Sequence, residues 1–247
     1  MLLLASSLMS DLYAQGFFDR IVPGASTSAR AILPMLFDRF SPTSVVDVGC
    51  GTGAWLSVAQ ELGVVDLLGI DGPWVAAESV MSGSEHFLEC DLGNVDPSID
   101  RRFEMCLSTE VAEHLPPQRS AGFVDLLCRL SDVVVFSAAI PRQGGMGHVN
   151  ERWQSFWVGQ FERNGFGVLD PVRPAVWNDD NVEPWYRQNL LVFVKGAAAD
   201  ARMIDVVHPY FAERGLSVPS HPLVVRARQL LKKVRNTGRG LVARVRR

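Results

Sequence analysis

One short segment of the chain has the residue types of a ligand-binding turn. A β-branched apolar run, Val45–Val48, contains one carboxylate, Asp47. It ends in three glycines at alternate positions, Gly49, Gly51 and Gly53. We interpret this pattern as a buried strand that breaks into a tight turn, where the backbone adopts conformations closed to other residues and comes close to a ligand. The helical pattern that follows presents free backbone N–H groups at the same point.

A second carboxylate lies at an informative distance from this turn. Asp71 ends a predicted strand, 67–70, and follows the glycines by roughly twenty residues. A carboxylate at that spacing suits the two hydroxyls of a ribose. The turn and the acid together predict a site for a nucleoside-containing cofactor.

The glycine spacing fits two such cofactors. The turn satisfies the loose dinucleotide fingerprint G-x-G-x-x-A. Asp47 favours S-adenosylmethionine (SAM) instead, because a carboxylate there can face an amino-acid ammonium and would repel a pyrophosphate. Asp91 ends another predicted strand, where it can bond an adenine amino group. We therefore expect SAM, with a dinucleotide as the alternative.

Four segments in this order resemble the motifs of class I SAM-dependent methyltransferases. They read VVDVGCGTG (45–53), GIDG (69–72), ECDL (89–92) and FEMCLSTEVAEHLP (103–116), and the resemblance covers about residues 40 to 195. It implies an α/β, Rossmann-like fold with a seven-stranded, mostly parallel sheet, helices on both faces and an antiparallel last strand. The expected cofactor-binding residues are Asp47, Gly49, Gly51, Gly53, Asp71, Gly72, Asp91 and Leu92.

Two carboxylates and two imidazoles are candidates for the reaction itself. Glu110, Glu113 and His114 form a Glu-x-x-Glu-His pattern, in which residues three and four apart share a face if a helical turn begins there. His148, in the glycine-rich segment 144–151, follows the fifth predicted strand and can approach from the opposite side. Such a set can hold a divalent cation and leave positions for substrate oxygens. We predict all four as catalytic residues and as ligands of Mg²⁺ or another divalent metal.

The same four residues resemble the metal site of small-RNA 3′-terminal ribose 2′-O-methyltransferases. The first three also resemble a motif in ubiquinone-pathway O-methyltransferases. The resemblance implies an ion that grips the acceptor oxygens, lowers the pKa of the acceptor hydroxyl and fixes it near the methyl sulfonium. Two alternatives stay open: His148 as a general base without metal, and residues that only orient a loop.

The elements that must position these residues alternate along the chain. Strands are predicted at 44–48, 67–70, 87–89, 105–108, 133–137, 167–171 and 190–195, and helices at 29–40, 54–62, 120–130 and 153–164. This alternation predicts a parallel sheet covered by helices on both faces, with ligands beyond the carboxyl ends of the strands. The long segment between the last two strands shows no clear helix, which is compatible with an antiparallel last strand.

Aromatic residues flank the predicted site. Trp55 and Trp74 lie beside the expected adenosine position and either stack on adenine or pack into the fold. The loop 176–189 is long, polar and aromatic. Its side chains suit a sugar ring, or else cover the edge of the sheet.

Composition limits the organisation of the chain. A length of 247 residues with 47% hydrophobic content supports one substantial domain. We expect an N-terminal helical segment at 1–40, a SAM-binding domain at 41–200 and a basic extension at 201–247. The four cysteines lack paired metal spacing, which predicts reduced core thiols in a cytoplasmic protein. The apolar run at 1–4 is too short for a membrane span and makes a poor signal peptide.

The end of the chain has a different composition. Residues 221–247 include nine Lys or Arg and no Asp or Glu, interleaved with apolar residues. This pattern predicts a basic amphipathic helix that makes peripheral contact with an anionic membrane or contacts nucleic acid. The alternative is a solubilising tail, or one that docks on the acidic remainder of the chain.

The residues and the resemblance together predict a SAM-dependent methyltransferase that acts on oxygen. Nothing resembles the Asn/Asp-Pro-Pro-Tyr motif of many amino-group methyltransferases. The segments SAAIP, GHVNE and WYRQN resemble uncharacterised bacterial methyltransferases of glycan and natural-product pathways. We therefore expect a small-molecule or glycan acceptor, methylated on a sugar or glycoconjugate hydroxyl. One alternative is a ribose or RNA 2′-O-methyltransferase, which the acidic body disfavours and the basic tail favours. The others are a dinucleotide-dependent oxidoreductase and a non-catalytic SAM-binding module.

Overall fold

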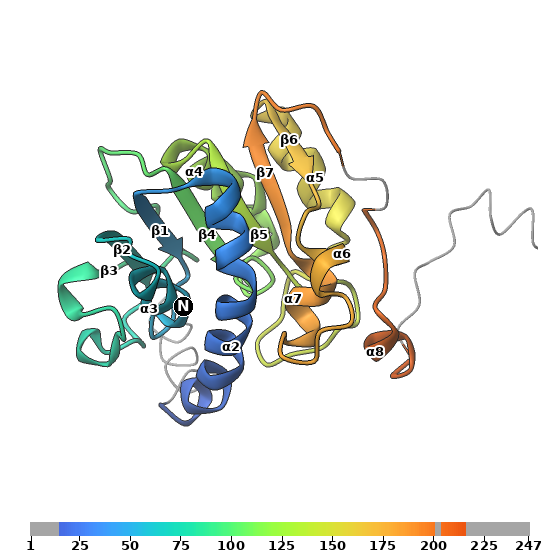
Figure 1. Ribbon diagram of the computed structural model, residues 1–247, viewed down its shortest axis with the longest axis horizontal. Helices are drawn as coiled ribbons and strands as arrows, with labels where there is room; N and C mark the ends of the chain where they lie inside the picture. Colours follow the sequence, from blue (N-terminus) through green and yellow to red (C-terminus); the bar gives the residue numbers. More distant parts are fainter. Residues whose placement is uncertain (1–14, 201–203, 216–247) are drawn as a thin grey trace, which may run out of the picture.

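A seven-stranded sheet forms the centre of the computed structural model, which describes residues 15–200 and 204–215 (Figure 1). The strands run in the order β3-β2-β1-β4-β5-β7-β6. Their bounds are β1 (Ser44–Val48), β2 (Asp66–Asp71), β3 (Phe87–Glu89), β4 (Met105–Thr109), β5 (Val133–Ser137), β6 (Phe166–Leu169) and β7 (Leu191–Lys195). Strands β1 to β5 pair in parallel, whereas β7 runs antiparallel to β5 and to β6. The predicted fold class is confirmed.

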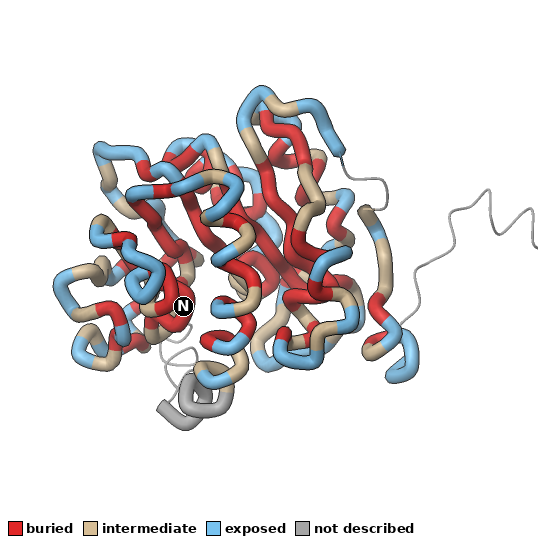
Figure 2. The backbone as a smooth tube through the Cα atoms, in the orientation of Figure 1, coloured by how far each residue is buried: buried red, intermediate tan, exposed pale blue. Residues whose placement is uncertain are grey.

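Helices cover both faces of the sheet. On one face lie α2 (Gln15–Phe40) and α3 (Ala54–Glu61), and on the other α4 (Ser120–Leu130) and α5 (Gln154–Arg163) (Figure 1). Short 3₁₀ turns occur at Ala77–Ser79, Ser84–His86 and Pro117–Arg119. Successive residues of a strand point to opposite faces, so Val45 packs with α2 and α3 while Val46 packs with α4 and α5. Figure 2 shows the central strands buried between these layers.

The connection from β6 to β7 differs from the prediction. We expected no helix there, but the segment contains α6 (Arg173–Val176) and α7 (Pro184–Asn189). Helices of four and six residues are too short to show a hydrophobic period, so their stability depends on tertiary packing. Val176 and Tyr186 provide that packing, because both are buried in the core beside α2 and α3.

Helix α2 begins earlier than the predicted start at residue 29. It continues through Pro23 and Pro34, although proline usually ends or kinks a helix. Its residues Ile32 and Leu36 share a core cluster with α3. The domain boundaries drawn at residues 40 and 200 stay predictions.

Helix α8 (Pro209–Ala212) is the last described element of the chain. It follows β7, and its Phe211 packs against Ile140. The basic segment 221–247 lies outside the described residues.

All four cysteines are buried and free. Among the described residues, no helix is both long and apolar enough to cross a membrane.

Candidate active site

A cavity of about 440 Å³ opens beyond the carboxyl ends of the central strands. Its lining comes from the segments that follow β1, β2, β3, β4 and β5, and from helices α2 and α7. Parallel strands present these ends on one edge of the sheet, which is where ligands bind in such folds. The cavity therefore collects residues that are far apart in the sequence.

The glycine turn after β1 has the backbone that the sequence predicted. Gly49, Gly51 and Gly53 have φ angles of 85°, 52° and 76°, in the region that favours glycine. A Cβ atom at Gly49 would lie 2.3 Å from a methyl group of Val111. The turn is tied to β2, because the Gly49 N–H donates to the Ile70 carbonyl at 2.7 Å.

Asp71 joins this turn to the end of β2. Its Oδ2 accepts a hydrogen bond from the Gly51 N–H at 2.7 Å. Its Oδ1 accepts from the Gly72 N–H at 2.7 Å and from the Trp74 indole N–H at 2.8 Å. Burial raises the pKa of Asp71, and these three hydrogen bonds oppose that rise. Its contact with a ribose stays a prediction.

Asp47 is a buried carboxylate that lacks a full set of partners. The residue is 1% exposed, lines the cavity, and its Oδ1 has no hydrogen-bond partner. Burial, and secondly the charge of Asp71, raise the pKa of Asp47 to about 8. A buried charge without a partner is costly, so a cation beside Asp47 would be stabilised. This feature fits the ammonium group of SAM.

The remaining predicted cofactor residues divide into two groups. Asp91 and Leu92 line the cavity, and Asp91 accepts hydrogen bonds from the Gly93 N–H at 3.0 Å and the Asn94 amide at 2.6 Å. Gly53 and Gly72 are not among the lining residues. They instead shape the backbone beside it, since Gly53 precedes α3 and a Cβ at residue 72 would collide with the Trp74 ring.

The two tryptophans line the cavity in different ways. Trp55 is 3% exposed, and its ring lies edge-on to Tyr186 with centroids 5.2 Å apart. Trp74 instead donates its indole N–H to Asp71. Trp55 therefore packs into the fold, while Trp74 lies against the carboxylate expected to hold the ribose.

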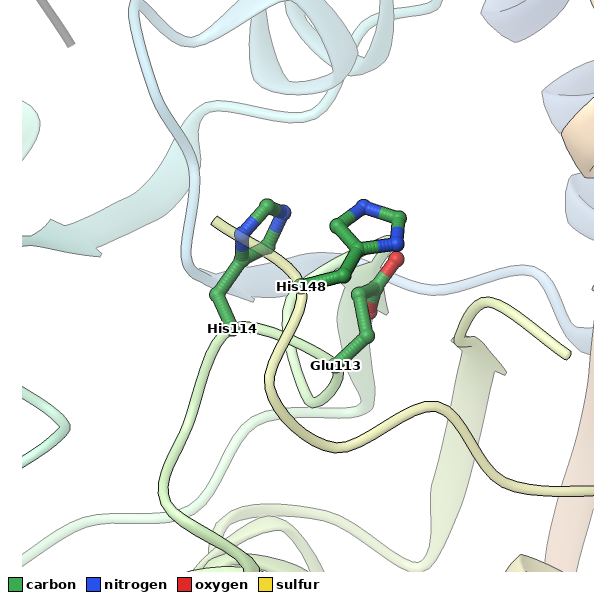
Figure 3. Close-up of side chains that lie close together, drawn as sticks. All are labelled: Glu113, His114 and His148. Carbon is green, nitrogen blue, oxygen red and sulfur yellow. The ribbon is translucent and has the colours of Figure 1, made fainter. Parts of the chain in front are cut away.

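Three of the four predicted metal ligands gather at one point of the cavity. Glu113, His114 and His148 each offer a ligand atom, and these atoms lie within 4.8 Å of one another (Figure 3). The rings of His114 and His148 meet edge to face, with centroids 4.8 Å apart. We call these three residues the Glu-His-His group.

Burial in the Glu-His-His group favours the neutral form of the His114 imidazole and disfavours the ionised form of the Glu113 carboxyl group. Glu113 is fully buried, and neither carboxylate oxygen has a well-formed hydrogen bond. Burial, and secondly the charge of Glu110, raise the pKa of Glu113 well above its usual range. Burial, and secondly the charge of His148, lower the pKa of His114 to about 4. His114 is therefore neutral near pH 7, the form that binds metals.

Glu110 does not belong to this group. Its carboxylate accepts hydrogen bonds from the Asn189 amide at 3.1 Å and the Gln143 amide at 3.2 Å. Its φ angle is 55°, a left-handed conformation that is uncommon for glutamate. The expected helical turn is therefore absent. A tight turn forms instead, in which the His114 N–H donates a hydrogen bond to the Val111 carbonyl. Three of the four predicted ligands therefore lie together, and Glu110, which acts on Glu113 from beside the group, stays a predicted ligand.

Several lining residues lie outside the predicted set. Ile21 and Val22 of α2 line the cavity, together with Trp185 and Tyr186 of α7. The aromatic pair falls in the loop that we expected to suit a sugar ring. Ile21 and Val22 belong to no sequence motif. Their place in the cavity depends on how α2 crosses the sheet, so residue spacing could not predict it.

Comparisons with known proteins identify the family. A sequence model described as "Methyltransferase domain" matches residues 21–170, more than half of the chain. The chain therefore belongs to this family of class I SAM-dependent methyltransferases. SAM is the cofactor expected for members of this family, and the activity of this chain is proposed below.

Individual relatives share the fold at low sequence identity. Magnesium protoporphyrin IX methyltransferase from Synechocystis PCC 6803, solved with SAM, has a TM-score of 0.55 and 15% identity, over 77% of this chain and 96% of that chain. The methyltransferase domain of bacterial CtHen1-C has a TM-score of 0.51 and 18% identity, over 70% and 100%. Ribosomal protein L11 methyltransferase from Clostridium perfringens is 27% identical over 143 residues, 55% of this chain. The chain covers only 41% of that curated relative.

Proposed function

We propose that this methyltransferase transfers a methyl group to a hydroxyl of a sugar or glycoconjugate, with the acceptor oxygens held by a divalent cation on the Glu-His-His group. The observation that carries the proposal is the buried Glu113 carboxylate. It lacks a well-formed hydrogen bond, and two imidazoles lie beside it. The family assignment supports neither the oxidoreductase nor the non-catalytic module considered above.

The residues of this group fit a divalent cation. One carboxylate and two imidazoles are a common donor set for such ions, and Glu113 supplies the negative charge that compensates the ion. A bound cation would polarise acceptor oxygens and lower the pKa of the acceptor hydroxyl. Neutral His114 needs to lose no proton near pH 7 in order to bind it. His148, whose ring meets that of His114, would complete the set.

The cofactor residues have separate tasks. SAM supplies an electrophilic methyl group on a sulfonium. Asp47 would hold the ammonium, because it is a buried carboxylate with an unpaired oxygen. Asp71 would hold the ribose, and Asp91 the adenine amino group. The backbone of the glycine turn leaves room for the close approach that these contacts need.

The charge of the cavity favours a neutral acceptor. Its described lining includes five carboxyl groups and no Lys or Arg. An anionic acceptor such as an RNA end would be repelled there, since nucleic-acid binding depends largely on cationic contacts to phosphate. Trp185 and Tyr186 add aromatic surface, which suits a sugar ring. An RNA ribose is the second candidate, favoured by the resemblance of the ligand group and disfavoured by this charge.

A methyl-transfer screen tests the proposal. Labelled SAM would be incubated with neutral glycosides, glycolipids and short RNAs, each with Mg²⁺, with Mn²⁺ or with EDTA. We expect label on a neutral glycoside or glycolipid, and its loss with EDTA. Transfer to RNA alone would select the second candidate. Transfer that EDTA leaves unchanged would refute the metal role.

A further inference from the structure

A single carboxylate organises the segment that carries His148. Residues 141–150, which we call the His148 loop, follow β5 and contribute to the cavity. Glu151, directly after this loop, folds back onto it. Its Oε2 accepts from the Arg142 N–H at 2.6 Å, and its Oε1 accepts from the Gly144 N–H at 2.8 Å. The same Oε1 lies 3.1 Å from Nδ1 of His148.

This contact selects one form of the imidazole. A carboxylate can only accept hydrogen bonds, so Nδ1 of His148 must carry the proton. The neutral ring then has its lone pair on Nε2, the atom left for a metal ion or for a proton. Metal-binding histidines commonly donate their other N–H to a carboxylate in this way. The side chains of His148 and Glu151 are only 12% and 20% exposed, so water screens this contact weakly.

The backbone restrains the same ring from another side. A Cβ atom at Gly145 would lie 2.2 Å from Nε2 and 2.3 Å from Cε1 of His148. Gly145 therefore lies directly against the ring, and any side chain there would displace it. The loop is also fixed to the turn that bears Glu113, because the Val149 and Asn150 N–H groups donate to the Glu113 carbonyl at 2.9 and 3.0 Å.

We propose that Glu151 is a positioning residue, which holds His148 with Nδ1 protonated and the lone pair on Nε2, the ring nitrogen that Glu151 does not contact. The effect of Glu151 on metal binding rests on the function proposed above. The effect of Glu151 on which ring nitrogen of His148 carries the proton does not, and it can be measured without any metal.

The first measurement is the tautomer of His148 in the full-length, metal-free protein. Long-range ¹H–¹⁵N spectra at pH 8.5 show which ring nitrogen carries the proton, and His148→Ala identifies the signal. We expect the Nδ1–H form in the wild type and a shift toward Nε2–H in Glu151→Gln. An Nε2–H form in the wild type would overturn the proposal, whatever the metal experiments show.

The second measurement is the affinity for Mn²⁺ alone, by calorimetry or paramagnetic resonance. We expect Glu151→Gln to weaken Mn²⁺ binding about 10- to 100-fold, because outer hydrogen-bond partners of ligands have effects of that size. Gly145→Ala should act similarly by displacing the ring. SAM affinity should stay within about twofold in both variants, which shows that each remains folded.

Gly159→Ala is the matched control. Gly159 lies inside α5 with open space around its Cα, so an added Cβ meets nothing. Mn²⁺ binding should not change in this variant. Unchanged Mn²⁺ affinity in Glu151→Gln, with loss in His148→Ala, would overturn the positioning role and leave the metal site intact. No Mn²⁺ binding by the wild type would refute the metal site, while the tautomer measurement would still decide the role of Glu151.

Discussion

The two sides of the cavity are stabilised differently. On the side of the glycine turn, Asp71 receives three hydrogen bonds, two of them from backbone N–H groups within the same motif. On the side of the Glu-His-His group, Glu113 receives none that is well formed. The first side is a preformed backbone cradle. On the second side, burial of the Glu113 carboxylate is unfavourable, and a bound cation would offset that unfavourable free energy.

Asp47 is the exception that makes the comparison useful. It belongs to the turn side, yet its Oδ1 lacks a partner, as the oxygens of Glu113 do. Each side therefore contains one buried carboxylate that a bound cation would stabilise. We expect the ammonium of SAM to meet one, and a divalent ion to meet the other.

Removing the charge of Glu113 should separate the two sides most clearly. We expect Glu113→Gln to lower kcat/KM by about 10²-fold or more, because the group that would hold the acceptor is lost. SAM affinity should remain within about twofold. The variant should be at least as stable as the wild type at pH 7, since it removes a buried carboxylate. Radiolabel transfer, calorimetry and thermal unfolding measure the three quantities.

The same side should behave as one unit. His148→Ala should cause a loss similar to that of Glu113→Gln, and the double variant should be little worse than either single variant. Additive losses in kcat/KM would show that the two residues act separately. In that case the pH dependence of the rate would test His148 as a general base.

Asp47 should make the ligand-free protein less stable as pH rises. The pKa of Asp47 is about 8 in the folded state and 3.8 in the unfolded chain. Between these values the folded state retains a proton that the unfolded state has released, so this contribution to stability falls with rising pH. Asp47→Asn should remove the effect, on the order of 2–4 kcal/mol by pH 8. Urea unfolding of both proteins from pH 5 to pH 8 measures it, and parallel curves would contradict the prediction.

Asp71 should have a smaller effect, confined to the cofactor. We expect Asp71→Ala to weaken SAM binding by roughly 1–3 kcal/mol, because charge-assisted hydrogen bonds to the ribose are lost. Mn²⁺ affinity should not change. Calorimetry that finds the wild-type SAM affinity, or tighter binding of NAD than of SAM, would contradict the assignment.

The basic segment at the end of the chain should have the smallest effect on either side. A chain ending at residue 215 retains helix α8 and its packing on Ile140, so SAM affinity should be unchanged. If the segment contacts anionic lipid, the truncation should abolish salt-sensitive liposome binding. Equal liposome binding by both forms would reject the membrane contact.

The sequence by itself determined the turn side of the cavity. The glycines, Asp47 and Asp71 belong to one strand–turn–helix–strand unit, in which short-range sterics and strand alternation fix the backbone. The alternation of apolar segments likewise predicted the sheet and its four main helices. Such features are local, so they can be seen in the chain without knowledge of tertiary contacts.

Only the tertiary structure decided the other side. The left-handed backbone of Glu110 breaks the helical spacing on which a four-ligand prediction depended. Its partner Asn189 is 79 residues away in the sequence. Glu151 approaches His148 only because the loop folds back on itself, and α7 is stable only as part of a packed core. These contacts depend on distances between separate loops at one sheet edge, which neither local propensity nor residue spacing encodes.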